Sequence, residues 1–291
     1  MELNDEKILG LREIANNIRE SIVEMLLSAG SGHTAGPLGM TDVFTILYFH
    51  ILKHDPKNID WEERDRVVLS NGHICPVLYA TMAHAGYMPV SELNTLRKFG
   101  SRLQGHPHRE FMTWLETSSG PLGAGLSQAV GMSIALRMNG STSLTTGKNF
   151  VYCFLGDGEL NEGQNWEAIM LSGKERLGKL VVFVDRNNIQ IDGNTEDIMP
   201  LNSLTAKWTA FNWHVQEIDG HNFEMINDAV GKAHAVPEQP SVIICRTIPG
   251  KGVPEFEYDY HWHGKAPNKD EAKKALEELY TLGGKIKAEH H

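Results

Sequence analysis

Two apolar runs and the polar residues that follow each of them decide the fold. They read Val151-Tyr-Cys-Phe-Leu-Gly-Asp-Gly-Glu-Leu-Asn-Glu-Gly163 and Leu180-Val-Val-Phe-Val-Asp-Arg-Asn-Asn-Ile-Gln-Ile-Asp-Gly193. The continuous apolar stretches Val151–Leu155 and Leu180–Val184 are typical of buried parallel strands. A helical pattern at about 163–176 separates them, so this unit is predicted to be a strand–helix–strand crossover.

The same alternation continues on both sides of this unit. Further strands are expected at 67–69, 214–218 and 241–246, and helices at 6–29, 40–52, 126–138, 223–234 and 269–282. Residues 86–121 are expected to be largely irregular, which favours a functional role, and residues 139–148 to be a polar loop. The predicted architecture is α/β: a doubly wound parallel sheet flanked by helices, formed by residues 1–291 as a single domain with a C-terminal helical extension at about 268–284.

Composition limits the classes of partner and location. The chain has 291 residues and a formal net charge of −10, which argues against nucleic acid or a membrane surface as the main partner. Its three cysteines form no Cys-x-x-Cys pair, and Cys153 and Cys245 lie in apolar runs, as in proteins of a reducing cytosol. There is no apolar run of membrane length, and the acidic N-terminal residues do not resemble a targeting peptide. A cytoplasmic location is expected.

Polar residues follow both central strands. Asp157 comes after the first strand, and Asp185 and Asn187 close the second, at the sheet edge where α/β proteins bind ligands. Residues 156–167 hold four acids and no Lys or Arg, so an anion would need a divalent metal to bind there. The glycines Gly156 and Gly158 would let a phosphate approach the backbone closely. The sequence therefore favours a metal and diphosphate site over the alternative, a glycine turn with an unrelated Asn pair downstream.

Four histidines lie in loops that contain glycine or proline: His33, His73, His106 and His263. Such loops suit a bound diphosphate, and a neutral imidazole can donate to hydroxyl or phosphate groups and move protons near pH 7. The other histidines are expected to be ordinary structural residues. His50 and His54 have zinc-like spacing, but Ile51 stands where a zinc protease has Glu and no third ligand is evident.

These motifs together closely resemble the N-terminal, diphosphate-binding domain of transketolases, which are thiamine-diphosphate enzymes. In order they are Ser31-Gly-His33, Ser70-Asn-Gly-His73, Gly105-His-Pro107, Gly120-Pro-Leu-Gly-Ala-Gly125, Gly156-Asp-Gly158, the segment from Asp185 to Gly193, and His263-Gly264. Gly156-Asp-Gly158 is followed by Asn187 after 28 intervening residues. The loop after His33 departs from the commonest pattern, because Thr34-Ala35 replace the frequent Pro-Gly.

The resemblance implies a role for each matched position. It implies Mg²⁺ or Ca²⁺ ligation by Asp157, Asn187 and the carbonyl of Ile189. It implies thiamine diphosphate binding by His73, Gly120, Pro121, Leu122, Gly156, Gly158, Glu162, Asn187, Ile191 and His263. The catalytic positions would be His33, His73, His106 and His263. Among these, His33, His106 and His263 would line the cofactor's reactive carbon and the sugar hydroxyls, while Glu162 would lie near a subunit interface.

The implied reaction is transfer of a two-carbon ketol unit from a ketose phosphate to an aldose phosphate. Complete transketolases continue into a pyrimidine-binding domain and a C-terminal domain, which this chain lacks. We therefore expect one subunit of a split transketolase, active only with a second subunit that carries those domains, in an α2β2 assembly. Three alternatives remain: an α-subunit of a 2-oxo-acid dehydrogenase, a non-catalytic paralogue, or part of a longer enzyme.

Overall fold

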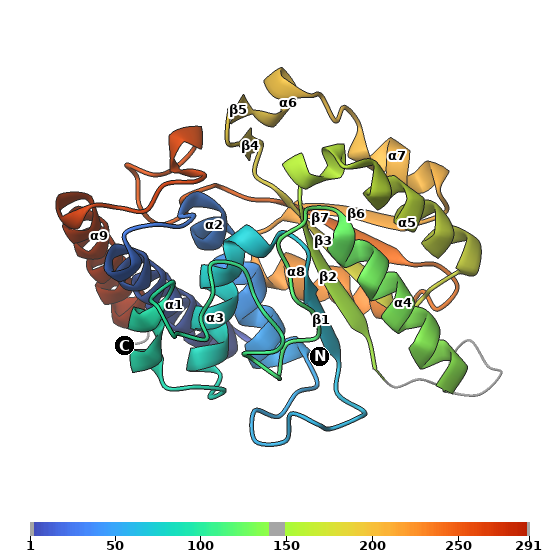
Figure 1. The fold of residues 1–291 in the computed structure, drawn as a ribbon, viewed down its shortest axis with the longest axis horizontal. Coiled ribbons are helices and arrows are strands. Elements are labelled where there is room, and N and C mark those ends of the chain that lie inside the picture. The colour runs from blue at the N-terminus through green and yellow to red at the C-terminus, as the bar shows by residue number, and fades with distance from the viewer. Residues whose placement is uncertain (1–2, 140–148, 290–291) are drawn as a thin grey trace.

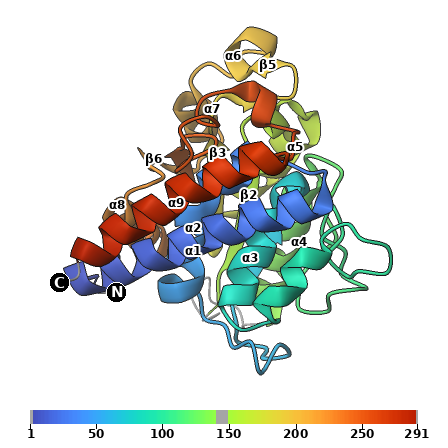
Figure 2. The ribbon, with the colours of Figure 1, turned by 90° about the vertical axis from the view of Figure 1, so that its left-hand side faces the viewer.

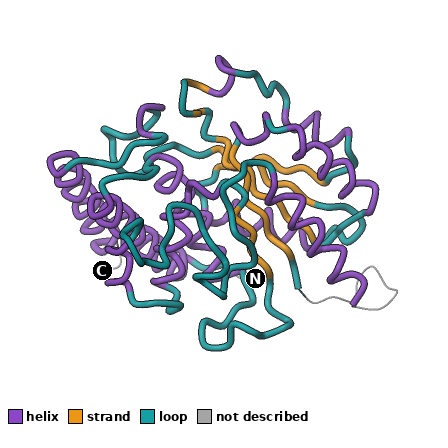
Figure 3. Tube along the Cα trace, in the orientation of Figure 1, coloured by secondary structure: helices purple, strands orange, loops and turns teal. Residues whose placement is uncertain are grey.

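The computed structural model describes residues 3–139 and 149–289, so nearly all of the polar loop expected at 139–148 lies outside the described residues. The described chain has the α/β architecture predicted from the sequence. Figure 1 and Figure 3 show a central sheet with helices on both faces.

The main sheet of the described chain is parallel throughout, with strand order β1-β2-β3-β7-β6. Its strands are β1 (Arg66–Leu69), β2 (Val151–Gly156), β3 (Leu180–Arg186), β7 (Ser241–Arg246) and β6 (His214–Asp219). A small antiparallel ribbon of β4 (Ile189–Gln190) and β5 (Gly193–Asn194) follows β3, and the sequence did not predict it.

The helices of the described chain are α1 (Asp5–Ala29), α2 (Ala35–Ile46), α3 (Cys75–His84), α4 (Ala124–Asn139), α5 (Gly163–Glu175), α6 (Thr195–Ile198), α7 (Leu204–Ala210), α8 (Phe223–His234) and α9 (Lys269–Glu289). A π-helical turn, Leu47–Ile51, continues α2. Short 3-10 turns occupy Gly72–Ile74, Val90–Thr95, Gly158–Asn161 and Tyr260–Trp262. Most of 86–121 is therefore irregular, as predicted.

Alternate residues of the central strands enter two separate apolar layers, because successive side chains of a strand point to opposite faces. Tyr152 and Phe154 of β2 pack with α1, α2, α3 and α8, and the Phe154 ring lies 4.3 Å from that of Phe44 between ring centroids. Val151 and Cys153 pack with α4, α5 and α7 on the other face. This two-sided covering confirms the doubly wound arrangement.

Helix α2 begins earlier than the sequence indicated. It was expected from Met40 because a loop was expected over the glycine- and proline-rich segment before it, but the helix starts at Ala35. Pro37 is tolerated because the first turn of a helix has no intrahelical partner for its N–H groups. A Cβ on Gly36 would lie 2.8 Å from Ile74 Cγ2, and one on Gly39 would lie 2.9 Å from the Ile248 carbonyl oxygen. The glycines thus allow a fully buried helix to pack closely against its neighbours.

Helix α9 is longer than the expected 269–282 and lies alongside α1, as Figure 2 shows. Its apolar side is formed by Ala272, Ala275, Leu279 and Ile286, all buried. Gly283 and Gly284 follow the expected end of this helix, but they lie inside it. A Cβ on Gly283 would approach Asn16 Nδ2 of α1 to 2.9 Å, so close packing between the two helices explains at least this glycine.

The parallel sheet places the motif residues at one edge. Gly156 pairs in register with Asp185, so the turns after β2 and β3 begin side by side. The loop after β1 carries His73 at the same carboxyl-terminal edge. Among the described residues, no helix is both long and apolar enough to span a membrane.

Candidate functional site

Three of the four predicted histidines form a cluster. Ring centroids of His33 and His73 are 4.9 Å apart, those of His73 and His263 are 5.2 Å apart, and those of His33 and His263 are 5.6 Å apart. The three rings come from the loop before α2, the turn after β1 and the turn before α9. The fold therefore brings together residues separated by more than half of the chain.

The environment keeps these imidazoles neutral. Burial, together with the neighbouring His263, Arg97 and His106, lowers the pKa of His33 to about 4. Burial alone lowers the pKa of His263 to about 4, and burial first of all lowers the pKa of His73 well below its ordinary value. The Nδ1 atoms of His33 and His263 are buried and have no hydrogen-bond partner within the described chain. Buried polar atoms without a partner are rare, and they point to a ligand or water at this position.

The fourth histidine, His106, is exposed and lies at the rim of the cluster. It is close enough to lower the pKa values of His33 and His73 electrostatically, after burial as the main cause. Gly120 faces it, since a Cβ built on Gly120 would lie 3.9 Å from the Cβ of His106. The predicted segment Gly120-Pro121-Leu122 therefore lies beside the histidines, with Pro121 and Leu122 exposed.

Asp157 lies in the turn directly after β2 and is 1 % exposed. Its Oδ1 accepts a hydrogen bond from Gly158 N at 2.7 Å, and its Oδ2 accepts from Asn188 N at 2.8 Å and from Arg186 Nη1 at 3.0 Å. Burial raises the pKa of Asp157, and the Arg186 guanidinium and the backbone donors oppose that shift. The turn after β2 is thereby joined to the turn after β3.

The segment after β3 supplies the other predicted metal ligands. Asn187 Oδ1 accepts from Ile189 N at 3.0 Å, and its Nδ2 donates to Asp185 Oδ2 at 2.8 Å. Asp185 also accepts from the Thr247 hydroxyl, and burial together with Asp157 raises the pKa of Asp185 to about 7. The amide of Asn187 is thus fixed with its oxygen on the side of Ile189.

Ile191 connects the two halves of the site. It is 63 % exposed, and its side chain lies next to Gly264 and therefore next to the histidine cluster. A Cβ on Gly264 would lie 3.8 Å from Ile191 Cγ1 and 3.9 Å from His33 Nε2. An exposed apolar side chain in this place is available to pack against a flat ring.

Glu159 is a central residue of the site to which the sequence gave no role. It is 2 % exposed, and its carboxylate accepts from the Ser70 hydroxyl, from Gly123 N at 2.7 Å and from Gly156 N at 3.1 Å. Burial raises its pKa to about 7, although these donors oppose the shift. The spacing of acids in 156–167 could show a charged turn, but not which carboxylate points inward.

Predicted Glu162 is exposed and lies at the start of α5. A Cβ on Gly123 would be 2.9 Å from the Cβ of Glu162, so this acid borders the Gly120–Gly123 segment. The predicted positions therefore gather at one edge of the sheet, in two adjoining groups: the histidines with Gly120, and the turns after β2 and β3.

The residues present fit a metal and a diphosphate. Asp157, Asn187 and the carbonyl of Ile189 are oxygen donors of the type that Mg²⁺ and Ca²⁺ prefer. A Cβ on Gly158 would lie 3.0 Å from Gln190 Cγ, so a side chain at this position would crowd Gln190. Asn71, which is fully buried near Gly156, has both side-chain polar atoms unpaired within the described chain. The donor set, the narrow glycine turn and the unpaired polar atoms all favour a polar ligand at this edge.

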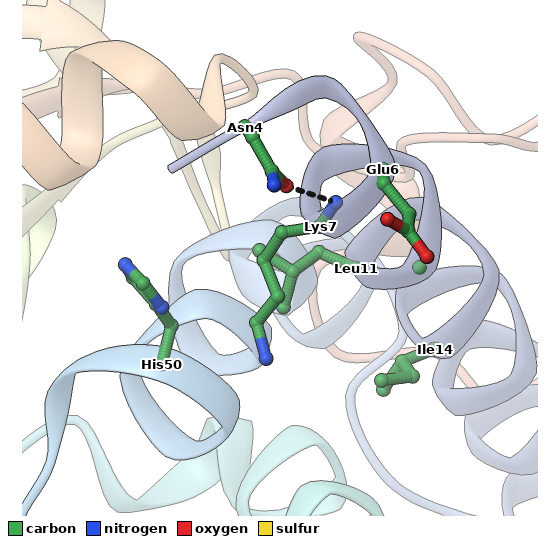
Figure 4. A pocket seen from close by; sticks show the side chains of 7 residues that line it. Asn4, Glu6, Lys7, Leu11, Ile14 and His50 are labelled. Carbon is green, nitrogen blue, oxygen red and sulfur yellow. Dashed lines mark hydrogen bonds between the residues drawn. The ribbon is translucent and has the colours of Figure 1, made fainter. Parts of the chain in front are cut away.

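Most other histidines have structural partners. His54 uses both ring nitrogens, with Tyr87 Oη at 3.0 Å and the Tyr48 carbonyl at 2.7 Å. Within the described residues no group of three His, Cys, Asp or Glu side chains is arranged to hold a metal. His50 lines a separate pocket of about 540 Å³ beside the start of α1, with Asn4, Glu6, Lys7, Gly10, Leu11 and Ile14 (Figure 4). This pocket contains none of the predicted site residues.

Comparison with known proteins shows to which family the chain belongs. Residues 11–284 match the family described as "Transketolase, thiamine diphosphate binding domain". The 6-deoxy-6-sulfo-D-fructose transketolase subunit SqwG of Clostridium sp. (strain MSTE9) is 42 % identical over 278 residues, which cover 96 % of this chain and 99 % of that subunit. Transketolase 1 of Escherichia coli (strain K12) is 39 % identical over 87 % of this chain, but the match spans only 39 % of that enzyme.

Solved structures agree with the sequence relatives. The transketolase of Campylobacter jejuni superimposes with a TM-score of 0.86 at 34 % sequence identity, covering 96 % of this chain and 43 % of that one. The chain thus spans about two-fifths of the full-length transketolases that it matches, and nearly the whole of one small subunit. Fold, site geometry and relatives lead to one conclusion: the chain belongs to the transketolase family and has the fold of its thiamine diphosphate binding domain.

Proposed function

We propose that this chain is the diphosphate-binding subunit of a split transketolase, which moves a two-carbon ketol unit from a ketose phosphate to an aldose phosphate. The observation that carries the proposal is the cluster of three neutral, half-buried imidazoles beside the turns after β2 and β3. Several neutral N–H donors and nitrogen acceptors in one place suit a polyhydroxylated substrate.

Each group of the site has a distinct task in this proposal. Asp157, Asn187 and the Ile189 carbonyl hold Mg²⁺ or Ca²⁺, and His73, Gly156, Gly158 and His263 contact the diphosphate. Gly120, Pro121, Leu122, Glu162 and Ile191 border the rings of thiamine diphosphate. When bound, that cofactor supplies the nucleophilic carbon that accepts the two-carbon unit.

The histidines act on the substrate. His33 and His106 hold sugar hydroxyls, and His263 moves a proton to or from the substrate oxygen nearest the transferred bond. A pKa of about 4 leaves His33 and His263 unprotonated near pH 7. His263 can therefore act as a base there, and it would become an acid only after accepting a proton from the substrate.

A partner subunit completes the site. The small relative SqwG is described as a transketolase subunit and matches this chain over almost its whole length. We infer that a second chain carries the pyrimidine-binding and C-terminal domains, that the two form an α2β2 assembly in the cytoplasm, and that neither is active alone. The chain would form a single domain in that assembly.

The other functions are less well supported. An α-subunit of a 2-oxo-acid dehydrogenase has no need of four histidines suited to polyol recognition. A non-catalytic paralogue would be free to lose Asp157 or the histidines, yet they are all present and gathered at one edge of the sheet.

The metal site is tested by removing its ligands. Asn187→Ala and Asp157→Asn should each weaken binding of thiamine diphosphate with Mg²⁺ by at least about a hundredfold, since the metal holds the diphosphate. Isothermal titration calorimetry measures this, and far-UV circular dichroism checks the fold. Asp228→Ala is the matched control, because it removes an exposed carboxylate from α8. Wild-type affinity in both site variants would refute the assignment.

The split-enzyme proposal is tested by reconstitution. The tagged chain should recover one stoichiometric partner from its source cells in the presence of thiamine diphosphate and Mg²⁺. Ketol transfer should then appear in the recovered complex, and His263→Ala should lower its turnover without dissociating it. Ketol transfer by the chain alone would show that no partner is needed.

A further inference from the structure

The guanidinium of Arg186 is buried against the predicted metal ligand Asp157. Arg186 is the last residue of β3, and its side chain is 6 % exposed, compared with 2 % for that of Asp157. Nη1 of the arginine lies 3.0 Å from Oδ2 of the aspartate. Two opposite charges are therefore paired out of water at the position where a cation is expected to bind.

The hydrogen bonds of Asp157 leave one oxygen available. A carboxylate oxygen offers about two acceptor positions. Oδ2 uses two, for Arg186 Nη1 and Asn188 N, whereas Oδ1 uses one, for Gly158 N. Oδ1 can still bind a metal while Arg186 remains in place, so the arginine does not block the site.

Arg186 is held at its other side as well. Its Nη2 donates to Glu196 Oε1, and the Glu196 carboxylate in turn accepts from Leu201 N at 3.1 Å and Asn202 N at 3.2 Å. Glu196 is 41 % exposed on its side chain, so solvent screens its charge much more than that of Asp157. The guanidinium is thus a fixed positive charge whose main buried counter-charge is Asp157.

We propose that Arg186 is a positioning residue that makes metal binding depend on the diphosphate. This inference rests on the proposed function. Without the cofactor, the charge of Asp157 is already compensated, and the other ligands, the Asn187 amide and the Ile189 carbonyl, are neutral. A free divalent cation is then only weakly attracted to the site, and the nearby Arg186 guanidinium repels it. The diphosphate adds the negative charge that the site needs, so metal and diphosphate bind together.

The experiment measures binding of Mn²⁺ alone, as a hard divalent probe, by electron paramagnetic resonance of the free ion. Arg186→Gln removes the charge and keeps an N–H donor, and Arg186→Lys keeps the charge. The matched control is Arg246→Gln, because Arg246 is the register partner of Arg186 on β7 and pairs with Glu217 on the surface. Arg186→Gln should bind Mn²⁺ at least about tenfold more tightly than the wild type, and the other two within about twofold.

An unchanged or weaker Mn²⁺ affinity in folded Arg186→Gln would overturn the proposal. Should this variant not fold, the wild type decides: thiamine diphosphate must raise Mn²⁺ affinity at least about a hundredfold, and any smaller effect refutes the coupling. The proposed function fails separately, through wild-type cofactor affinity in both Asn187→Ala and Asp157→Asn. If those metal-site variants lose cofactor binding but Arg186→Gln does not bind Mn²⁺ more tightly than the wild type, only the role of Arg186 is overturned.

Discussion

A single carboxylate, that of Glu159, ties together three turns of the candidate site. Ser70 belongs to the turn after β1, Gly123 to the segment before α4, and Gly156 to the end of β2. Ser70 Oγ also accepts from Gly125 N at 3.1 Å, so the network reaches the first turn of α4. Glu159 thus fixes the loops around the predicted cofactor position before any ligand binds.

Replacing Glu159 should cost stability. Each carboxylate oxygen of Glu159 accepts from one backbone N–H group, that of Gly123 or that of Gly156. In Glu159→Gln an NH₂ group replaces one of these oxygens, so one of the two backbone N–H groups loses its acceptor. Leaving such a buried donor unpaired costs about 1–3 kcal/mol, and Glu159→Ala should cost more. Urea unfolding followed by circular dichroism measures this. Glu167→Gln on the exposed side of α5 serves as the control, and an equal effect of the two Gln variants would contradict the role of Glu159.

At the residue scale the sequence indicated candidate ligand and proton-transfer residues, but not the residues that hold them in place. The four histidines, Asp157 and Asn187 were singled out because each lies in a glycine- or proline-containing loop or at a strand end, and their roles stay predictions. Glu159 and Arg186 lie in the same quoted segments, but whether their side chains point inward depends on turns and strand faces that only tertiary packing decides.

At the scale of elements, buried charges connect α1, α2 and the turn after β6. Asp42 of α2 accepts from Arg19 Nη2 at 2.6 Å and from His221 Nδ1 at 2.7 Å, and His221 Nε2 accepts from Ile248 N at 2.8 Å. Burial alone would raise the pKa of Asp42, but Arg19 and His221 outweigh it and lower the pKa to about 2.

Asp42→Ala should therefore destabilise the protein by about 3–5 kcal/mol, because Arg19 would remain buried without its counter-charge. Urea denaturation provides the measurement, with Glu24→Gln on the exposed side of α1 as the control. The double variant Arg19→Met/Asp42→Leu should recover part of the loss. A loss below about 1 kcal/mol for Asp42→Ala would show that the charges do not join these elements.

The elements were predictable to differing degrees. The central strands were predicted nearly at their observed bounds because their apolar runs are uninterrupted, and α5 because it lies between the two strands as their crossover. The start of α2 was missed because Gly36, Pro37 and Gly39 are ordinary signs of a loop. Their presence in the helix reflects close packing against Ile74 and Ile248, which are distant in sequence.

At the scale of the whole molecule, buried neutral histidines make stability depend on pH. His234 accepts from or donates to Tyr152 Oη at 2.8 Å and stacks on Phe150, and burial first, then Lys179 and Lys53, lower its pKa to about 4. Below pH 6.5 the unfolded chain binds a proton that the folded chain does not, so this contribution to stability falls as the pH falls toward 4.

Asp185 and Glu159 act in the opposite direction. Their pKa values are raised to about 7 in the folded protein, so their contribution to stability increases as the pH falls. The histidine effect is therefore best seen by comparison with His234→Gln. The stability advantage of the wild type over this variant should shrink by about 1 kcal/mol between pH 7.5 and 5.5. Urea unfolding at both pH values measures it, and His261→Gln, an exposed imidazole, is the control. A constant advantage would mean that His234 titrates normally.

The two apolar layers also determine where the chain can change length. Tyr152 and Phe154 pack in one layer, and Val151 and Cys153 pack in the other. Deletion of one residue inside β2 or β3 would therefore turn every later side chain of that strand to the opposite face. An insertion at exposed loop residues such as Lys57 and Asn58, which precede β1, would leave both layers intact. Among relatives, deletions and insertions should therefore gather between the strands and be absent within them.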